Sequence, residues 1–166
     1  MLQGSELTID GCLSLMDYYS SAHFACHASQ NAADPLESRF IFHEGYLNLL
    51  AVIRQILQDV DLAFLSACQT STGEEKLSDE AVHLAAGMLA AGYRRVVPTM
   101  WSIGDRHAPG VSFDFYHYLW KDKKDRFEGA KSAQALHHAI QSLRLRLNDD
   151  SEKSLLAWIP YVHFGY

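Results

Sequence analysis

The sequence is poor in cysteine and lacks the long apolar runs of a membrane protein. Its three cysteines are an odd number without the spacing of a disulfide framework, so we expect a free thiol and a reducing compartment, cytosolic or nuclear. No Cys-x-x-Cys pair occurs, which argues against structural zinc. No apolar run reaches the roughly 18 residues of a membrane span, and the first residues lack the features of a signal peptide.

Positive charge is also scarce. The 14 Lys and Arg stand against 20 Asp and Glu, and the one basic run, 121–126, is interrupted by acids. Because phosphate binding needs clustered cations, we do not expect the protein to bind nucleic acid or the surface of an anionic membrane. The chain has no Gly-x-Ser-x-Gly elbow and no Gly-x-Gly-x-x-Gly loop, which argues against an α/β-hydrolase or a dinucleotide-binding domain.

What the sequence does contain is an alternation of short apolar runs and helical patterns. The runs typical of strands buried on both faces of a parallel sheet are 21–26, 61–67 and 95–101. The segments with helical character are 8–20, 47–58, 78–91, 108–120 and 132–147. This order predicts an α/β fold with a mostly parallel sheet flanked by helices, and the length predicts a single domain over 1–166.

Two further segments complete the predicted sheet. The alternating stretch 39–47 bends at Gly45 and predicts a small hairpin. The segment 157–165 has the character of a last strand, with Pro160 near its start or on an exposed edge. Little sequence precedes the first strand, which leaves open that an N-terminal strand and helix of the fold are missing from the chain.

Two of the predicted helices should turn apolar faces inward. In the helix 108–120, Phe113, Tyr116 and Trp120 recur at helical spacing and are predicted to be core residues. The apolar positions of the helix 132–147 are predicted to pack on the sheet.

Two reactive residues follow successive predicted strands. His27 comes directly after the run 21–26, and Cys68 directly after the run 61–67. Functional groups gather at the carboxyl ends of parallel strands, so the two side chains should lie within one to two strand spacings of roughly 4.8 Å. An imidazole beside a thiol can remove its proton and later protonate a leaving amine. The pair therefore predicts a cysteine–histidine dyad.

Two neighbouring residues are alternatives for these roles. Alternation along a strand places His23 on the same face as His27, so His23 is an alternative base, although it lies deeper in the predicted sheet. Cys26 is the alternative thiol, but its side chain should point away from His27 and into the core. A cysteine at a strand end is also often a small core residue, so position alone does not decide the role.

The residues around both positions carry a more specific signal. His23-Phe-Ala-Cys-His27 and Leu65-Ser-Ala-Cys-Gln-Thr70 resemble the two signature motifs of the CHAT peptidases, relatives of caspases and separases. The resemblance is nearest in character to fungal CHAT proteins, where the first motif ends in His-Ala. It covers nearly the whole chain from His23 onward and continues through 79–93, 96–105 and 158–165.

The resemblance implies a general base at His27 and a nucleophile at Cys68. Caspase-like enzymes bind the oxyanion with the nucleophile's own amide and with a backbone donor near a glycine that follows the base. Here that position is Ala28, which keeps the amide but cannot freely adopt a positive φ. Because of this departure from the family pattern, a catalytically silent protein stays an alternative hypothesis.

The resemblance also implies a substrate site. The segment ending at Trp101-Ser102 would pair its backbone with the substrate peptide as an added strand. Asp105 is the candidate pocket residue for an arginine or lysine at the cleavage site. A core role for Trp101 and a turn-forming role for Asp105 stay open.

The function expected from these features is that of a cysteine endopeptidase acting on a peptide or protein, with neither a metal nor an organic cofactor. The resemblance implies a three-layer caspase-like fold and a place as the C-terminal effector of a longer signalling protein, downstream of a regulatory repeat region. The alternative is a catalytically silent caspase-like scaffold used for assembly. The oligomeric state is open.

Overall fold

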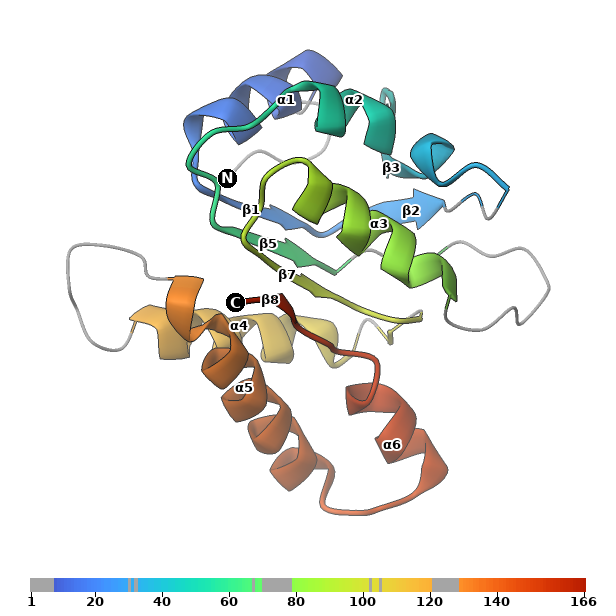
Figure 1. Ribbon diagram of the computed structural model, residues 1–166. Helices are drawn as coiled ribbons and strands as arrows, with labels where there is room; N and C mark the ends of the chain where they lie inside the picture. Colours follow the sequence, from blue (N-terminus) through green and yellow to red (C-terminus); the bar gives the residue numbers. More distant parts are fainter. Residues whose placement is uncertain are drawn as a thin grey trace.

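The computed structural model describes residues 8–29, 31, 33–66, 68–69, 79–101, 103–104, 106–120 and 129–166, with the backbone alone at 68, 69 and 79–81 (Figure 1). Its helices are α1 (Ile9–Tyr18), η2 (Pro35–Glu37), α2 (Leu49–Arg54), α3 (Asp79–Ala90), α4 (Ala108–Trp120), η3 (Gly129–Lys131), α5 (Ser132–Leu147) and α6 (Glu152–Trp158). Its strands are β1 (Ser21–Phe24), β2 (His27–Ser29), β3 (Arg39–Phe42), β4 (Gly45–Asn48), β5 (Leu62–Leu65), β6 (Cys68–Gln69), β7 (Arg95–Pro98) and β8 (Phe164–Gly165).

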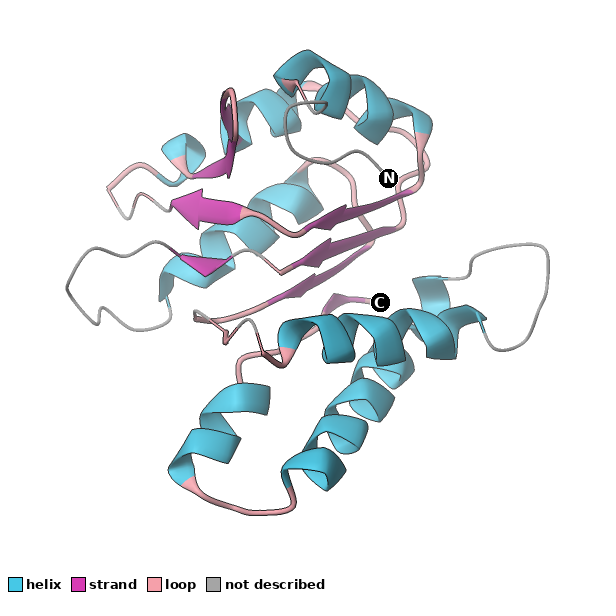
Figure 2. Ribbon diagram, turned by 180° about the vertical axis from the view of Figure 1, so that it is seen from behind, coloured by secondary structure: helices cyan, strands magenta, loops and turns pink. Residues whose placement is uncertain are grey.

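The strands form a main sheet and a smaller second sheet. The main sheet has the order β1-β5-β7-β8, in which the first three strands are parallel and β8 runs antiparallel to β7. The second sheet has the order β4-β3-β2-β6 and contains the predicted hairpin, β3 with β4. Helices flank the main sheet (Figures 1 and 2). The predicted α/β class is confirmed, and it is consistent with a caspase-like fold.

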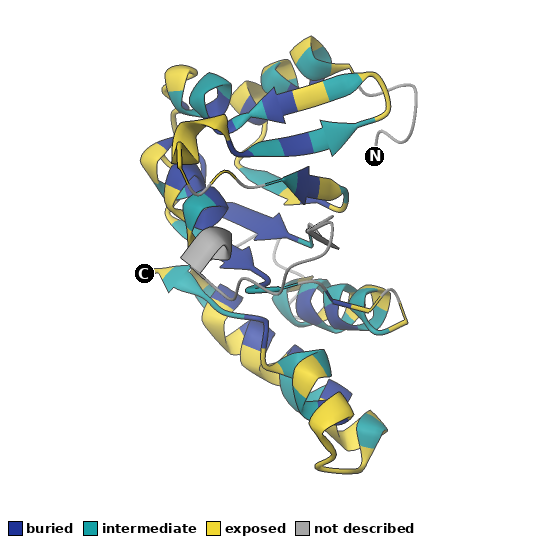
Figure 3. Ribbon diagram, turned by 90° about the vertical axis from the view of Figure 1, so that its right-hand side faces the viewer, coloured by how far each residue is buried: buried dark blue, intermediate teal, exposed yellow. Residues whose placement is uncertain are grey.

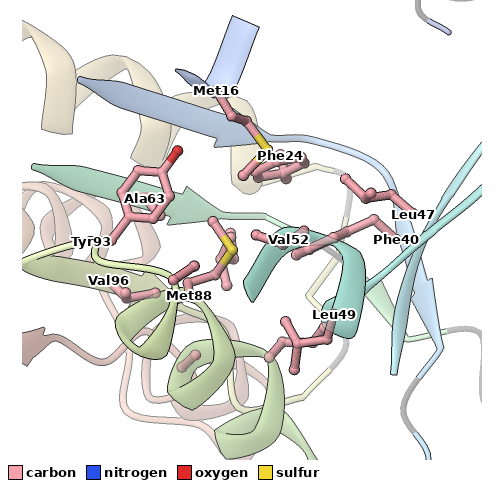
Figure 4. Packing of buried hydrophobic residues seen from close by; sticks show 14 of the residues in the cluster. Met16, Phe24, Phe40, Leu47, Leu49, Val52, Ala63, Met88, Tyr93 and Val96 are labelled. Carbon is pink, nitrogen blue, oxygen red and sulfur yellow. The ribbon is translucent and has the colours of Figure 1, made fainter. Parts of the chain in front are cut away.

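The main sheet separates two hydrophobic clusters, because successive strand residues face opposite ways. Ala63 and Leu65 of β5 belong to the upper core, which also holds residues of α1, α2 and α3. Leu62 and Phe64 belong to the lower core, shared with α4 and α5. All four residues of β5 are buried, which explains its continuous apolar run. Figure 4 shows the upper core, and Figure 3 shows how burial concentrates on the strands of the main sheet.

Local sequence signals set several helix ends. The Thr8 side chain accepts a hydrogen bond from the amide of Gly11 and caps α1, as predicted for a helix starting near Thr8. Asn48 caps α2 in the same way, accepting from the amide of Ala51 at 2.9 Å. Gly92 ends α3 with a φ of +113°, a conformation that suits glycine.

Two predicted strands were wrong in extent. The run 21–26 is not one strand: β1 ends at Phe24, and the chain then leaves the main sheet, so that His27 begins β2 in the second sheet. In 157–165, the helix α6 continues through Trp158, and the regular pairing with β7 is limited to β8, with single contacts of Tyr161 and Val162 beyond it. The Ser151 hydroxyl accepts from the amide of Ser154 and caps α6, a helix that was not predicted from the sequence.

The packing of the C-terminal helices also differs from the prediction. Of the three aromatics predicted to be core, Tyr116 packs against the lower core, whereas Phe113 and Trp120 are 68% and 63% exposed. Val111 and Phe115 are the buried residues of α4. The helix α5, in contrast, shares the lower core with strands of the main sheet as predicted, and it also packs against α4. The predicted helix 47–58 is shorter, because Leu47 belongs to β4 and α2 ends at Arg54. No helix in the described part of the chain combines the length and apolar character needed to cross a membrane.

Candidate active site

Two segments of the chain leave the main sheet together and enter the second sheet side by side. The parallel pair of β1 and β5 ends at Phe24 and Leu65. The parallel pair of β2 and β6 then begins at His27 and Cys68. The stretch from β1 to β2 has the same number of residues as the stretch from β5 to β6, so the register of the first strand pair carries over to the second. We call these two stretches the crossing segments, and the point where they leave the main sheet the crossing. They place His27 and Cys68 side by side at the start of the second pair.

This register makes His27 and Cys68 direct partners across the pair of β2 and β6. On its other side, His27 is paired with Ile41 of β3, and its side chain is exposed to solvent. The side chain of Cys68 lies outside the described residues. The sequence predicted that the two residues follow neighbouring strands. It did not foresee that both would begin strands of a separate sheet.

His23 lies at the end of the main sheet next to this crossing, with a different set of partners. Its Nε2 atom is 3.0 Å from the Oγ atom of Ser66, the first residue after β5. Its ring packs edge-on against Phe64, with centroids 4.9 Å apart, and lies 5.6 Å from the ring of Tyr116 on α4. The imidazole retains exposed surface, yet desolvation by these neighbours lowers its pKa to about 4. An imidazole with this pKa is neutral at physiological pH.

The family of the chain can be established by comparison. The family model for the CHAT domain matches residues 2–166. The chain belongs to the CHAT family. No curated protein matches it. The CHAT family consists of caspase-like cysteine peptidases, and membership in a peptidase family implies a protein substrate.

In this CHAT domain, Ala28 occupies the position next to the predicted base. Ala28 lies inside β2, paired with Phe40 of β3 and with Gln69 of β6, and it is 0% exposed. It is not among the described residues with a positive φ. The strand conformation at this position therefore accommodates alanine, and glycine is not needed for the backbone seen here.

The other thiols of the CHAT domain have core surroundings. Cys26 is half-buried and packs against the upper core, as predicted for a side chain turned away from His27. Cys12 of α1 is buried, and burial raises the pKa of its thiol to about 11. The raised pKa of Cys12 disfavours its thiolate at neutral pH. Among the described residues, no group of His, Cys, Asp and Glu side chains could hold a metal ion.

The predicted substrate segment follows β7. Trp101 is half-buried, and its indole Nε1 atom is buried with no hydrogen-bond partner among the described residues. Ser102 and Asp105 lie outside the described residues. The backbone just before Trp101 is held on one edge by the C-terminal segment, where the amide of Met100 donates to the carbonyl of Pro160 at 2.8 Å.

The same segment makes an isolated antiparallel bridge between Thr99 and Tyr161, and the amide of Val162 donates to the carbonyl of Pro98 at 3.3 Å. Sequence reasoning missed this support. The likeness of residues 158–165 to the family motif was visible, but nothing in it indicated which strand these residues would contact.

Proposed function

We propose that this CHAT domain is a cysteine endopeptidase in which Cys68 is the nucleophile and His27 is the general base. The observation that carries the proposal is the direct register of the two residues across β2 and β6. Register partners in a parallel pair lie about 4.8 Å apart and project to the same side of their sheet. That separation is within reach of a contact between a thiol and an imidazole.

The exposure of His27 supports its role. A base that serves a peptide substrate has to be reachable from solvent, and the His27 side chain is exposed at the edge where the two segments enter the second sheet. His23 is the poorer candidate, because its Nε2 atom is already engaged with Ser66 and its low pKa makes it a weak base.

The proposed reaction runs through an acyl-enzyme. His27 takes the proton of the Cys68 thiol, and the sulfur attacks the carbonyl carbon of the scissile peptide. The tetrahedral intermediate collapses as its C–N bond breaks, and the imidazolium of His27 gives its proton to the leaving amine. His27 then deprotonates a water molecule, and the resulting hydroxide attacks the thioester. As the C–S bond breaks and the second product leaves, the imidazolium of His27 returns the proton to the Cys68 thiolate.

The oxyanion of the intermediate requires donors fixed in advance. Following the family, these would be the amide of Cys68 and a backbone donor at Ala28. Ala28 is 0% exposed, so this second donor can meet an oxyanion only after a local change that uncovers it. This requirement also defines the second candidate function, a catalytically silent scaffold in which that change does not occur.

The proposal includes a substrate site and a place for the domain in a longer protein. The segment at Trp101 and Ser102 would take the substrate backbone as an added strand, and the carboxylate of Asp105 would bind an arginine or lysine before the cut. The domain would span 1–166 and act as the C-terminal effector of a longer cytosolic or nuclear signalling protein. The indole N–H of Trp101 has no partner among the described residues, and this supports a role in holding substrate, because a buried donor without a partner is costly.

Covalent labelling tests the proposal. The protein is incubated with an acyloxymethyl ketone peptide ending in arginine, and the modified residue is identified by mass spectrometry. We expect one adduct on Cys68, lost in Cys68→Ser and in His27→Ala but kept in the matched thiol control Cys26→Ser. If a small alkylating reagent modifies Cys68 while the peptide probe never does, the peptidase proposal fails and the scaffold is favoured.

A further inference from the structure

One side-chain contact joins the two segments at the point where they leave the main sheet. His23 of β1 contacts Ser66, which follows β5, with 3.0 Å between Nε2 and Oγ. The last backbone pair of the two strands is Phe24 with Leu65, so this contact lies at the end of the parallel ladder. Beyond it, one segment continues to His27 and the other to Cys68.

The surroundings of His23 fix the ring in place. His23 is in register with Phe64 on β5, whose ring it meets edge-on, and Tyr116 approaches from α4. Phe64 is itself fully buried in the lower core and contacts Phe115. These two ring contacts limit the rotamers of His23 although its side chain is exposed, so its hydrogen bond restrains the position of Ser66.

Because Ser66 lies close to Cys68 in the chain, its contact with His23 can affect the geometry of the candidate site. Ser66 is two positions before Cys68 in a segment whose backbone must pass from β5 to β6 without losing register. A displacement of the chain at Ser66 shifts the start of β6 relative to His27. Dyad chemistry is sensitive to displacements of this size, because the thiolate is stabilised only while the imidazole stays in contact with it.

We propose that His23 and Ser66 are positioning residues, which hold the crossing segments so that Cys68 and His27 keep their register across β2 and β6. His23 does not touch the substrate and takes no proton in the reaction; it acts through Ser66. The inference rests on the proposed dyad of His27 and Cys68.

The experiment measures how the alkylation rate of Cys68 by iodoacetamide depends on pH, with the modified peptide quantified by mass spectrometry. The rate follows the thiolate fraction, so the midpoint of the profile reports how well the imidazole stabilises the thiolate. The test variants are Ser66→Ala, which removes the hydroxyl, and His23→Phe, which keeps an aromatic ring. Ser66→Thr retains the hydroxyl and serves as the rescue variant.

The chain offers a matched control. Ser132 at the start of α5 makes the same kind of contact, with 2.8 Å between its Oγ atom and Nε2 of His163, near the strand β8 at the far edge of the main sheet. Ser132→Ala breaks a comparable bond away from the crossing. We expect it to lower the melting temperature without moving the alkylation midpoint.

For the wild-type protein we expect a midpoint below that of a free cysteine, about 8.5. Ser66→Ala and His23→Phe should each raise it by about one pH unit, which slows alkylation nearly tenfold below the wild-type midpoint. Ser66→Thr should restore it. Wild-type midpoints in Ser66→Ala and His23→Phe would overturn the inference, provided that His27→Ala shifts the profile. If His27→Ala leaves the profile unchanged, the dyad itself is wrong and the inference falls with it.

Discussion

At the scale of single residues, the site depends on how alanine and histidine side chains are accommodated next to the crossing segments. Ala28 is enclosed by Phe40 and Gln69 in a strand, so its methyl group contributes to the upper core. A glycine in its place would lose that contact and gain backbone freedom that the strand does not use.

We therefore predict that Ala28→Gly leaves the rate of peptide-probe labelling at Cys68 within about twofold of wild type while lowering stability. The loss of a buried methyl group and the added entropy of the unfolded chain should together cost about 1 to 2 kcal/mol in the free energy of unfolding. Denaturant unfolding and labelling kinetics on the same preparation check both parts. A labelling rate raised more than about tenfold would show that the active geometry needs a positive φ at this position.

Residue types and spacing predict His27 and Cys68 as the dyad, because both stand in extended motifs that resemble those of the family, and the structure pairs the two positions across β2 and β6. The contribution of Ser66 could not be predicted, since a serine next to a strand has many ordinary roles. Its importance comes from a contact to His23, a residue far away in the sequence.

At the scale of elements, the strength of the local signal decided which boundaries could be predicted. The helices α4 and α5 match the predicted ranges 108–120 and 132–147. The apolar periodicity of α5 is long and regular, and the charged run 121–126 marks the end of α4 in the sequence. The division of 21–26 between two sheets could not be predicted, since the apolar run is unbroken and the sheets diverge for tertiary reasons. The interface of α2 and α3 is another tertiary feature, in which Gly87 allows a close approach to Leu49.

We predict that Gly87→Ala destabilises the protein although it raises helix propensity. A Cβ atom at position 87 would lie 2.2 Å from the side chain of Leu49, a residue that is 2% exposed and has little room to move. Overpacking of this kind costs about 1 to 3 kcal/mol. Thermal unfolding measures the effect.

The matched substitution is Gly110→Ala in α4, where the nearest atom to a new Cβ is 3.5 Å away. This variant should be neutral or more stable by up to about 1 kcal/mol, because alanine is the better helix former. Equal effects of the two substitutions would contradict the described packing of α2 against α3.

At the scale of the whole molecule, polar contacts connect η3 and the start of α5 to the strands of the main sheet. The carboxylate of Asp61, before β5, forms an ion pair with Arg95 of β7 and accepts a hydrogen bond from the amide of Gly129 at 3.0 Å. His163, close to β8, contacts Ser132, and its pKa is lowered by desolvation and by the charge of Arg95. Two histidines of the fold, His23 and His163, are therefore kept neutral.

These histidines predict a loss of stability in mild acid. A lowered pKa in the folded state means that the unfolded chain binds more protons once the pH falls below its own histidine pKa, about 6.5. The free energy of unfolding should thus be flat above about 6.5 and decline toward pH 4, by at most about 1.4 kcal/mol per pH unit for each histidine and by less for the partly exposed His23.

Denaturant unfolding at several pH values measures this decline, and His23→Phe should make it shallower because one of the two groups is removed. An unchanged slope in that variant would show that His23 is not protected from protonation in the folded protein.

The most direct test of the central claim is to trap the acyl-enzyme. The protein is mixed with an activated ester of an arginyl peptide, quenched in acid within milliseconds to seconds and measured by intact and peptide mass. We predict a burst of acyl group on Cys68 that then decays by hydrolysis, and a burst at least about tenfold slower in His27→Ala. Acylation of Cys68 at the wild-type rate without His27, or accumulation of the acyl group on Cys26 instead, would contradict the dyad.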